Sequence, residues 1–128
     1  MKRSALLVAA LTLGAIRLAS AAEPRPFNQK DFDKLAHDRA AVVVEVYAPW
    51  CPTCKAQKPI VDSLAKQSAY QDVVVLSVDF DTDKTILQQL RVSVQGTLIA
   101  FKGGKETARS VGATSPAAIE GIFKKAGR

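Results

Sequence analysis

Apolar residues along the chain gather in two continuous, valine-rich runs, at residues 41–47 and 73–78. Such β-branched runs are typical of strands that are covered on both faces of a parallel sheet. Residues 97–102 and 105–111 flank Gly103-Gly104, which indicates a hairpin of two antiparallel strands. The pattern therefore predicts four strands, of which the last two are joined by a tight turn.

Other apolar residues recur every three or four positions, which is the spacing of one helix face. This spacing predicts helices at residues 27–39, 51–67, 84–91 and 115–123. Thr82 or Asp83 would cap the third helix, and Pro59 would kink the second. The order of elements predicts an α/β domain with a mixed central sheet of about four strands and helices on both faces.

The first 22 residues have the pattern of an export signal. Met1-Lys2-Arg3 is positively charged, residues 4–16 are small or apolar, and small residues suited to cleavage precede Ala21 and Ala22. The apolar run of about 12 residues is shorter than the ~20 residues that a membrane-spanning helix needs. We expect cleavage after Ala22, with Ala21 as the other possible site, and an exported, periplasmic domain of residues 23–128. An uncleaved membrane anchor is the alternative.

Charge changes this picture little. The formal net charge of +6 includes Lys2, Arg3 and Arg17 of the signal, so the remaining domain carries +3. Its lysines and arginines are scattered, whereas a nucleic-acid-binding surface needs them clustered on one face. We therefore expect no nucleic-acid partner.

The two cysteines, Cys51 and Cys54, lie three positions apart. An exported domain held together by disulfides would carry several cysteines far apart in the chain. A bridge between such close neighbours encloses little chain and so stabilises the fold little. The pair therefore indicates redox chemistry or metal binding.

Metal binding is the weaker of these two interpretations. A closed structural zinc site needs four ligands. The chain offers two thiols, one histidine and, beyond the signal, no methionine. Only a dimer that joined two cysteine pairs would complete such a site, so we expect no metal and a monomer.

The segment Trp50-Cys51-Pro52-Thr53-Cys54-Lys55, at a predicted strand-to-helix turn, is similar to the active-site motif of the thioredoxin superfamily. Residues 44–50 resemble the strand that enters this motif, and Pro59 matches the proline that kinks the helix after it. Residues 97–105 resemble the closing hairpin of the family, and the resemblance extends over residues 27–123. It implies a thioredoxin-like fold and a protein disulfide oxidoreductase whose redox group is its own cysteine disulfide, without another cofactor.

The position of Cys51 supports that chemistry. It stands where a strand ends and a helix begins, so unpaired amides and the positive helix end point at its sulfur and stabilise the thiolate, the attacking form. Cys51 would attack a substrate disulfide, and Cys54, one turn later and facing inward, would resolve the mixed disulfide. Trp50, Pro52 and Thr53 would shape the surface around an exposed Cys51 sulfur.

Glu45, in the middle of an apolar strand, is the candidate base for the proton of Cys54. Burial raises the pKa of a carboxyl group toward the range useful for proton transfer. The resemblance places a buried acid at this position, most often aspartate. It also places a lysine where this chain has Val75. The alternative puts Glu45 on an exposed face of the sheet.

The segment Gln95-Gly96-Thr97 departs from the family, which carries a cis-proline before the matching threonine. A cis bond before a non-proline residue costs ~2.5–4 kcal/mol, so we expect a trans bond between Gln95 and Gly96. Glycine lets the backbone approach the sulfurs closely, and Gln95 would offer its side-chain amide to a partner. The three residues are therefore candidates for substrate binding, with an ordinary turn as the alternative.

Together these features favour a periplasmic enzyme that reduces protein disulfides with electrons from a membrane-embedded thiol donor. Strong oxidants of the superfamily carry a histidine between the cysteines and a helical insertion, and this chain has neither. An oxidase of the same fold, a metal-binding module and a redox-inert peptide-binding domain are the alternatives.

Overall fold

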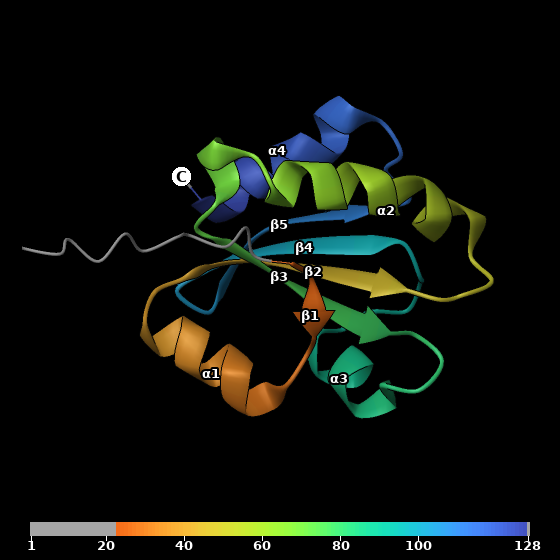
Figure 1. Ribbon diagram of the computed structural model, residues 1–128. Coiled ribbons are helices and arrows are strands. Elements are labelled where there is room, and N and C mark those ends of the chain that lie inside the picture. The colour runs from red at the N-terminus through yellow and green to blue at the C-terminus, as the bar shows by residue number, and fades with distance from the viewer. Residues whose placement is uncertain (1–22, 128) are drawn as a thin grey trace, which may run out of the picture.

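A five-stranded mixed sheet forms the centre of the computed structural model, which describes residues 23–127 (Figure 1). The strands lie in the order β1-β3-β2-β4-β5. β1, β2 and β3 are parallel, and β4 is antiparallel to β2 and to β5. The strands are β1 (Arg25–Pro26), β2 (Ala41–Tyr47), β3 (Val73–Asp79), β4 (Thr97–Lys102) and β5 (Lys105–Val111).

Helices cover both faces of this sheet, as the order of elements predicts (Figure 1). One face packs against α1 (Gln29–His37) and α3 (Lys84–Gln89). The other packs against α2 (Pro52–Ala65) and α4 (Pro116–Gly127), and a short 3-10 turn, η1 (Ser68–Tyr70), precedes β3. The predicted mixed sheet with helices on both faces is confirmed.

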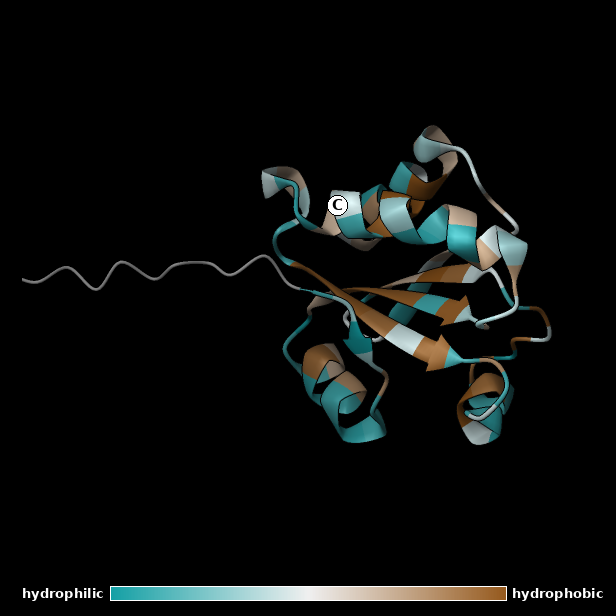
Figure 2. Ribbon diagram, turned by 45° about the vertical axis from the view of Figure 1, so that its right-hand side comes forward, coloured by the Kyte–Doolittle hydropathy of each residue, from teal (hydrophilic) through white to brown (hydrophobic). Residues whose placement is uncertain are grey.

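The continuous valine run of β2 is explained by burial on both sides. Val43 belongs to the core under α2 and α4, and Val44 belongs to the core above α1 and α3. Both side chains are fully buried. Figure 2 shows the central strands as largely apolar bands between helices whose outer faces are largely polar.

The prediction of about four strands misses β1. Arg25 and Pro26 pair in parallel with Leu76 and Ser77 at the edge of β3. Proline is compatible with an edge strand because its missing N–H need not join the sheet. Two residues give no alternating pattern, so this strand has no sequence signal of its own. Its pairing fixes the chain just before α1 beside the candidate site.

Helix boundaries depend on single side chains. The Asn28 side chain accepts a hydrogen bond from the Asp31 N–H (3.1 Å), so α1 begins later than predicted. Asp83 occupies the predicted cap position of α3, but its carboxylate accepts from the Asp79 N–H instead (2.8 Å). The predicted cap of the last helix is confirmed, since Ser115 Oγ accepts from the Ala118 N–H (3.2 Å).

The predicted export signal, residues 1–22, lies outside the described residues. Within residues 23–127, no helix has the length and apolar character required to cross a membrane.

Candidate functional site

A disulfide joins Cys51 and Cys54 at the start of α2, directly after the carboxyl end of β2. Cys51 is the N-cap residue with an extended backbone, and Pro52 is the first helical residue, where no amide hydrogen is needed. Cys51 Sγ accepts a hydrogen bond from the Cys54 N–H at 3.1 Å, and the two Cα atoms are 5.2 Å apart. The structure thus contains the predicted contact between a first-turn amide and the Cys51 sulfur.

Both cysteines are buried in this disulfide state, with exposed fractions of 1% for Cys51 and 8% for Cys54. They pack with Ala48, and half-buried Phe80 lies against them. The expectation of an exposed Cys51 sulfur is therefore wrong for the disulfide form. A partner must fit closely, or displace neighbouring side chains, before it can reach the sulfurs.

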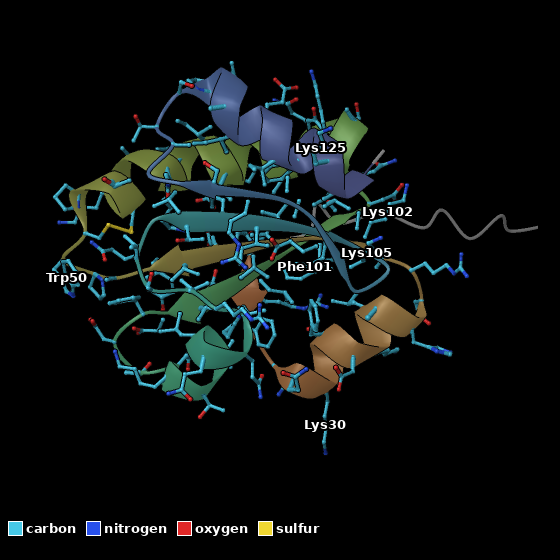
Figure 3. The ribbon with its side chains drawn as sticks, turned by 180° about the vertical axis from the view of Figure 1, so that it is seen from behind. Lys30, Trp50, Phe101, Lys102, Lys105 and Lys125 are labelled. Atoms are coloured by element: carbon cyan, nitrogen blue, oxygen red, sulfur yellow. A yellow bond between two sulfur atoms is a disulfide. The ribbon has the colours of Figure 1, made fainter. Side chains whose placement is uncertain are left out.

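Trp50 lies beside the disulfide and is 55% exposed (Figure 3). Its Nε1 donates to both carboxylate oxygens of Asp81, at 2.9 and 3.2 Å. This bond fixes an exposed indole that would otherwise be free to rotate. Asp81 is not among the site residues inferred from the sequence, and its only signal is the acidic segment that follows β3.

The loop before β4 faces the active-site helix. All peptide bonds within residues 23–127 are trans, so the trans bond expected between Gln95 and Gly96 is confirmed. Gly96 has φ +79°, and its N–H donates to the carbonyl oxygen of Val46 (2.8 Å). A Cβ on Gly96 would lie 3.2 Å from Thr53 Cγ2. The structure thus brings Gly96 and Thr53 into contact, and both the backbone angle and the close approach favour glycine.

The neighbours of Gly96 have different surroundings. Thr97 is buried, and its Oγ1 donates to the Val94 carbonyl oxygen (2.7 Å), which closes the loop. Gln95 is half-buried beside it. Pro59 lies inside α2, one turn beyond Cys54 and on the exposed side of the helix.

Gln57 is a buried polar residue that the sequence pattern did not single out. It is 4% exposed, and its Nε2 donates to the carbonyl oxygens of Gly96 (2.9 Å) and Ala113 (2.8 Å). These two bonds connect the active-site helix to the loop before β4 and to the segment before α4. A buried amide needs such partners, so Gln57 positions the Gly96 loop against the first turns of the active-site helix.

Glu45 lies in the middle of β2, opposite Ser77 of β3 and Leu98 of β4. Ser77 Oγ donates to Glu45 Oε1 at 2.5 Å. Burial raises the pKa of the Glu45 carboxyl above its ordinary value, and nearby Asp62 adds to that effect. The Ser77 hydrogen bond and the positive charge of Lys58 act in the opposite direction.

Glu45 and Cys54 line the same pocket, which has a volume of about 460 Å³. The Cys54 sulfur lies 3.8 Å from the carbonyl oxygen of Val46, the residue after Glu45. Arg25 and Pro26 of β1 form another part of the pocket wall. Glu45 is therefore half-buried and faces a pocket beneath the active-site helix, and the alternative of an exposed sheet face does not hold.

Metal ligands do not gather at this site. Among residues 23–127, no three histidine, cysteine, aspartate or glutamate side chains come together as a ligand set. The site therefore combines the disulfide, the half-buried carboxyl group of Glu45 and the hydrogen bonds around them.

Comparison with known proteins points in the same direction. The family model for thioredoxin matches residues 23–125. Thioredoxin-2 of Saccharomyces cerevisiae is 42% identical over 86 residues, which cover 67% of this chain and 80% of the yeast protein.

Solved structures give the same result. The crystal structure of Trxlp from Edwardsiella tarda is 42% identical, with a TM-score of 0.76 over 79% of this chain and 98% of that one. A mutant thioredoxin of Halobacterium salinarum is 26% identical, with a TM-score of 0.71 over 83% of this chain and 92% of that one. With the disulfide of Cys51 and Cys54 at the start of α2, these matches show that the chain belongs to the thioredoxin family and is a thiol–disulfide oxidoreductase.

Proposed function

We propose that this protein is an exported thioredoxin that reduces disulfides of periplasmic proteins with electrons from a membrane-embedded thiol donor. The observation that carries the proposal is the setting of the disulfide, which is buried at the start of α2 and has exposed apolar side chains on neighbouring segments. Trp50, Val94 and Val111 are 55%, 41% and 59% exposed, and we call these three residues the apolar rim. Exposed apolar groups at a functional site are typical of protein-docking surfaces.

Two members of the apolar rim flank the Gly96 loop. The Val94 carbonyl accepts a bond from Thr97, and Val111 pairs with Thr97 in the sheet. The N–H of Gly96 donates to Val46, while its carbonyl accepts from Gln57 and Gly112. Because both polar groups of Gly96 are used internally, a substrate backbone would bind the neighbouring Gln95 instead.

The reduction would proceed in two exchanges. The Cys51 thiolate attacks one sulfur of a substrate disulfide, which forms a mixed disulfide and releases one substrate thiolate. Glu45 accepts the proton of Cys54, and the Cys54 thiolate then attacks the Cys51 sulfur. This step forms the Cys51–Cys54 disulfide and releases the second substrate thiolate. Two electrons thus pass from the protein dithiol to the substrate, and a dithiol donor restores them by the same chemistry.

The surroundings of Cys51 support the reducing direction. The helix end contributes only ~0.3–1 kcal/mol to thiolate stability, and Pro52 and Thr53 add no charge. A strong oxidant needs a reduced form that is unusually stable, and one amide bond to the sulfur is modest support for such a form. The signal pattern of residues 1–22 supports export.

The reduction potential of the purified protein, measured by equilibration with glutathione, tests the direction. A value near about −270 mV supports a reductase, whereas a value near about −120 mV matches a strong oxidant and overturns that part of the proposal. Export is tested on the protein expressed from its full sequence in a Gram-negative host. The mature protein should be released with the periplasmic fraction and begin at Glu23. Recovery in the cytoplasm with residues 1–22 intact would contradict it.

A further inference from the structure

Lys58 lies between two pockets on the surface of α2. It lines the 460 Å³ pocket that contains Glu45 and Cys54, and it also lines a neighbouring pocket of about 270 Å³ that contains Asp62 and Lys66. Lys58, Asp62 and Lys66 follow one another at intervals of four residues, so they lie along one face of the helix. Lys58 thus has one carboxyl group on each side.

Lys58 is held by Asp62 through only one oxygen. The distance from Lys58 Nζ to Asp62 Oδ2 is 3.2 Å. Asp62 Oδ1 is buried and has no hydrogen-bond partner among the described residues. A buried carboxylate oxygen without a partner is unfavourable. The contact between Asp62 and Lys58 is therefore incomplete. The Lys58 ammonium group carries three donors, of which this contact uses one, and its side chain is largely exposed, so it can also turn toward the pocket that Glu45 lines.

The second carboxylate is Glu45, on the strand beneath α2. Lys58 favours the ionised form of Glu45 and Asp62 favours the protonated form, so the two α2 residues act on Glu45 in opposite directions. Val75, on the neighbouring strand β3, is buried and carries no charge. Lys58 is thus the cation on the wall of this pocket whose positive charge lowers the pKa of Glu45.

Other charged groups around the pocket are less free to take this role. Arg25 of β1 lines the pocket, but its guanidinium binds Asp31 through two hydrogen bonds of 2.8 Å. Asp83, before α3, also lines it and accepts a bond from the Asp79 N–H. Lys55 and Tyr47 complete the titratable groups of the wall besides Glu45, Cys54 and Lys58.

We propose that Lys58 and Asp62 are positioning residues that control proton transfer from Cys54 to Glu45, with Lys58 as a cation shared between the two carboxylates. The inference rests on the proposed function of Glu45 as the proton acceptor. When Lys58 lies toward Glu45, the carboxylate is ready to accept the proton. When Asp62 draws Lys58 away, Glu45 holds its proton and the Cys54 thiol stays protonated. The pair would thus decide the pH at which the resolving exchange becomes fast.

The test compares the full-length wild-type protein with the variants Lys58→Met, Asp62→Asn and Glu45→Gln. Two quantities are measured as a function of pH. One is the ionisation of the Glu45 carboxyl in the reduced protein, followed by carbon NMR and assigned by its loss in Glu45→Gln. The other is the rate at which Cys54 resolves a preformed mixed disulfide on Cys51. Lys66→Met removes a lysine from the same helix face and serves as the matched control.

Opposite shifts are expected. Lys58→Met should move both midpoints to higher pH, and Asp62→Asn should move them to lower pH. Each shift should correspond to a change of about threefold or more in the ratio of ionised to protonated Glu45. Lys58→Arg, which keeps the charge, should restore the wild-type profile, and Lys66→Met should leave it unchanged.

Two failures are distinguishable. If Glu45→Gln removes the pH dependence but Lys58→Met and Asp62→Asn leave the midpoints in place, or shift them in the same direction, the role of Lys58 and Asp62 is wrong. If Glu45→Gln leaves the rate profile unchanged, Glu45 is not the proton acceptor, and both the proposed function of Glu45 and this inference are overturned.

Discussion

Gln57 and Gly96 are 39 residues apart in the chain, and a hydrogen bond of 2.9 Å joins them. It runs from a side-chain amide of the active-site helix to the backbone of the loop that approaches Thr53, between the two cysteines. Because the same amide also donates to Ala113 (2.8 Å), one buried residue connects three parts of the chain. The position of the Gly96 loop relative to Cys51 therefore depends on Gln57.

Replacement of Gln57 by leucine should destabilise the protein by about 1–3 kcal/mol, because the buried carbonyl group of Gly96 and the partly buried one of Ala113 each lose a donor. The loop should also move away from the disulfide, which lowers the rate of exchange with protein disulfides more than with a small-molecule disulfide. Denaturant unfolding and the two rates measure these effects. Gln67→Leu, at an exposed position after α2, is the control. An equal loss of both rates would indicate a general effect on Cys51 and contradict a role in docking.

Gly96 is the second testable position. Proline, the residue that the family carries at the matching position, should not fit here. Gly96→Pro removes the N–H that donates to Val46 and requires a negative φ where the structure has +79°. We expect a loss of about 3 kcal/mol or more in unfolding free energy. Stability equal to that of the wild type would show that the loop can readily adopt the conformation found in relatives.

Gly96→Ala separates backbone strain from contact with Thr53. Gly112 has nearly the same φ, +76°, but nothing lies within 4 Å of a Cβ placed there. Gly112→Ala should thus show the backbone cost alone, about 1–2 kcal/mol, and Gly96→Ala should cost more. Thr53→Ser removes the Cγ2 methyl group and should recover part of the difference in the double variant. No recovery would mean that Thr53 does not restrict this site.

Glu45 should make the stability of the protein depend on pH. Its pKa is raised by burial in the folded state, so folding favours the protonated carboxyl. The stabilisation is complete below the unfolded-state pKa of about 4.3 and is lost as pH rises through the folded-state value. Glu45→Gln should therefore have little effect on stability at pH 4 and should increase it relative to the wild type at pH 8. Urea midpoints of both proteins at the two pH values measure the difference. If the stability of Glu45→Gln relative to the wild type falls between pH 4 and pH 8, burial is not the dominant effect on the pKa of Glu45.

The sequence predicts those parts of this fold that depend on local pattern. The valine runs of β2 and β3 could be identified because burial on both faces favours apolar residues at almost every position, and Glu45 was conspicuous there for the same reason. β1 could not be identified, since its two residues become a strand only by pairing with β3. Gln57 was missed because its acceptors lie 39 and 56 residues away, and no local spacing reports contacts of that kind. The depth of Cys51 also depends on tertiary packing, against Ala48 and Phe80.

The Cys54→Ser variant should trap substrates on Cys51, because the resolving thiol is absent and the mixed disulfide cannot be released. Partners bound through the disulfide should appear as reducible adducts on non-reducing gels of periplasmic extracts.

Replacing the exposed valines of the apolar rim, Val94→Ser and Val111→Ser, in this background should lower the yield of protein adducts without changing the reaction with a small-molecule disulfide. A Cys51→Ser/Cys54→Ser variant controls for non-covalent capture. Equal adduct yields with and without the rim valines would show that docking does not depend on this surface. Adducts that form through the remaining cysteine in a Cys51→Ser variant as readily as in Cys54→Ser would show that the attack has been assigned to the wrong sulfur.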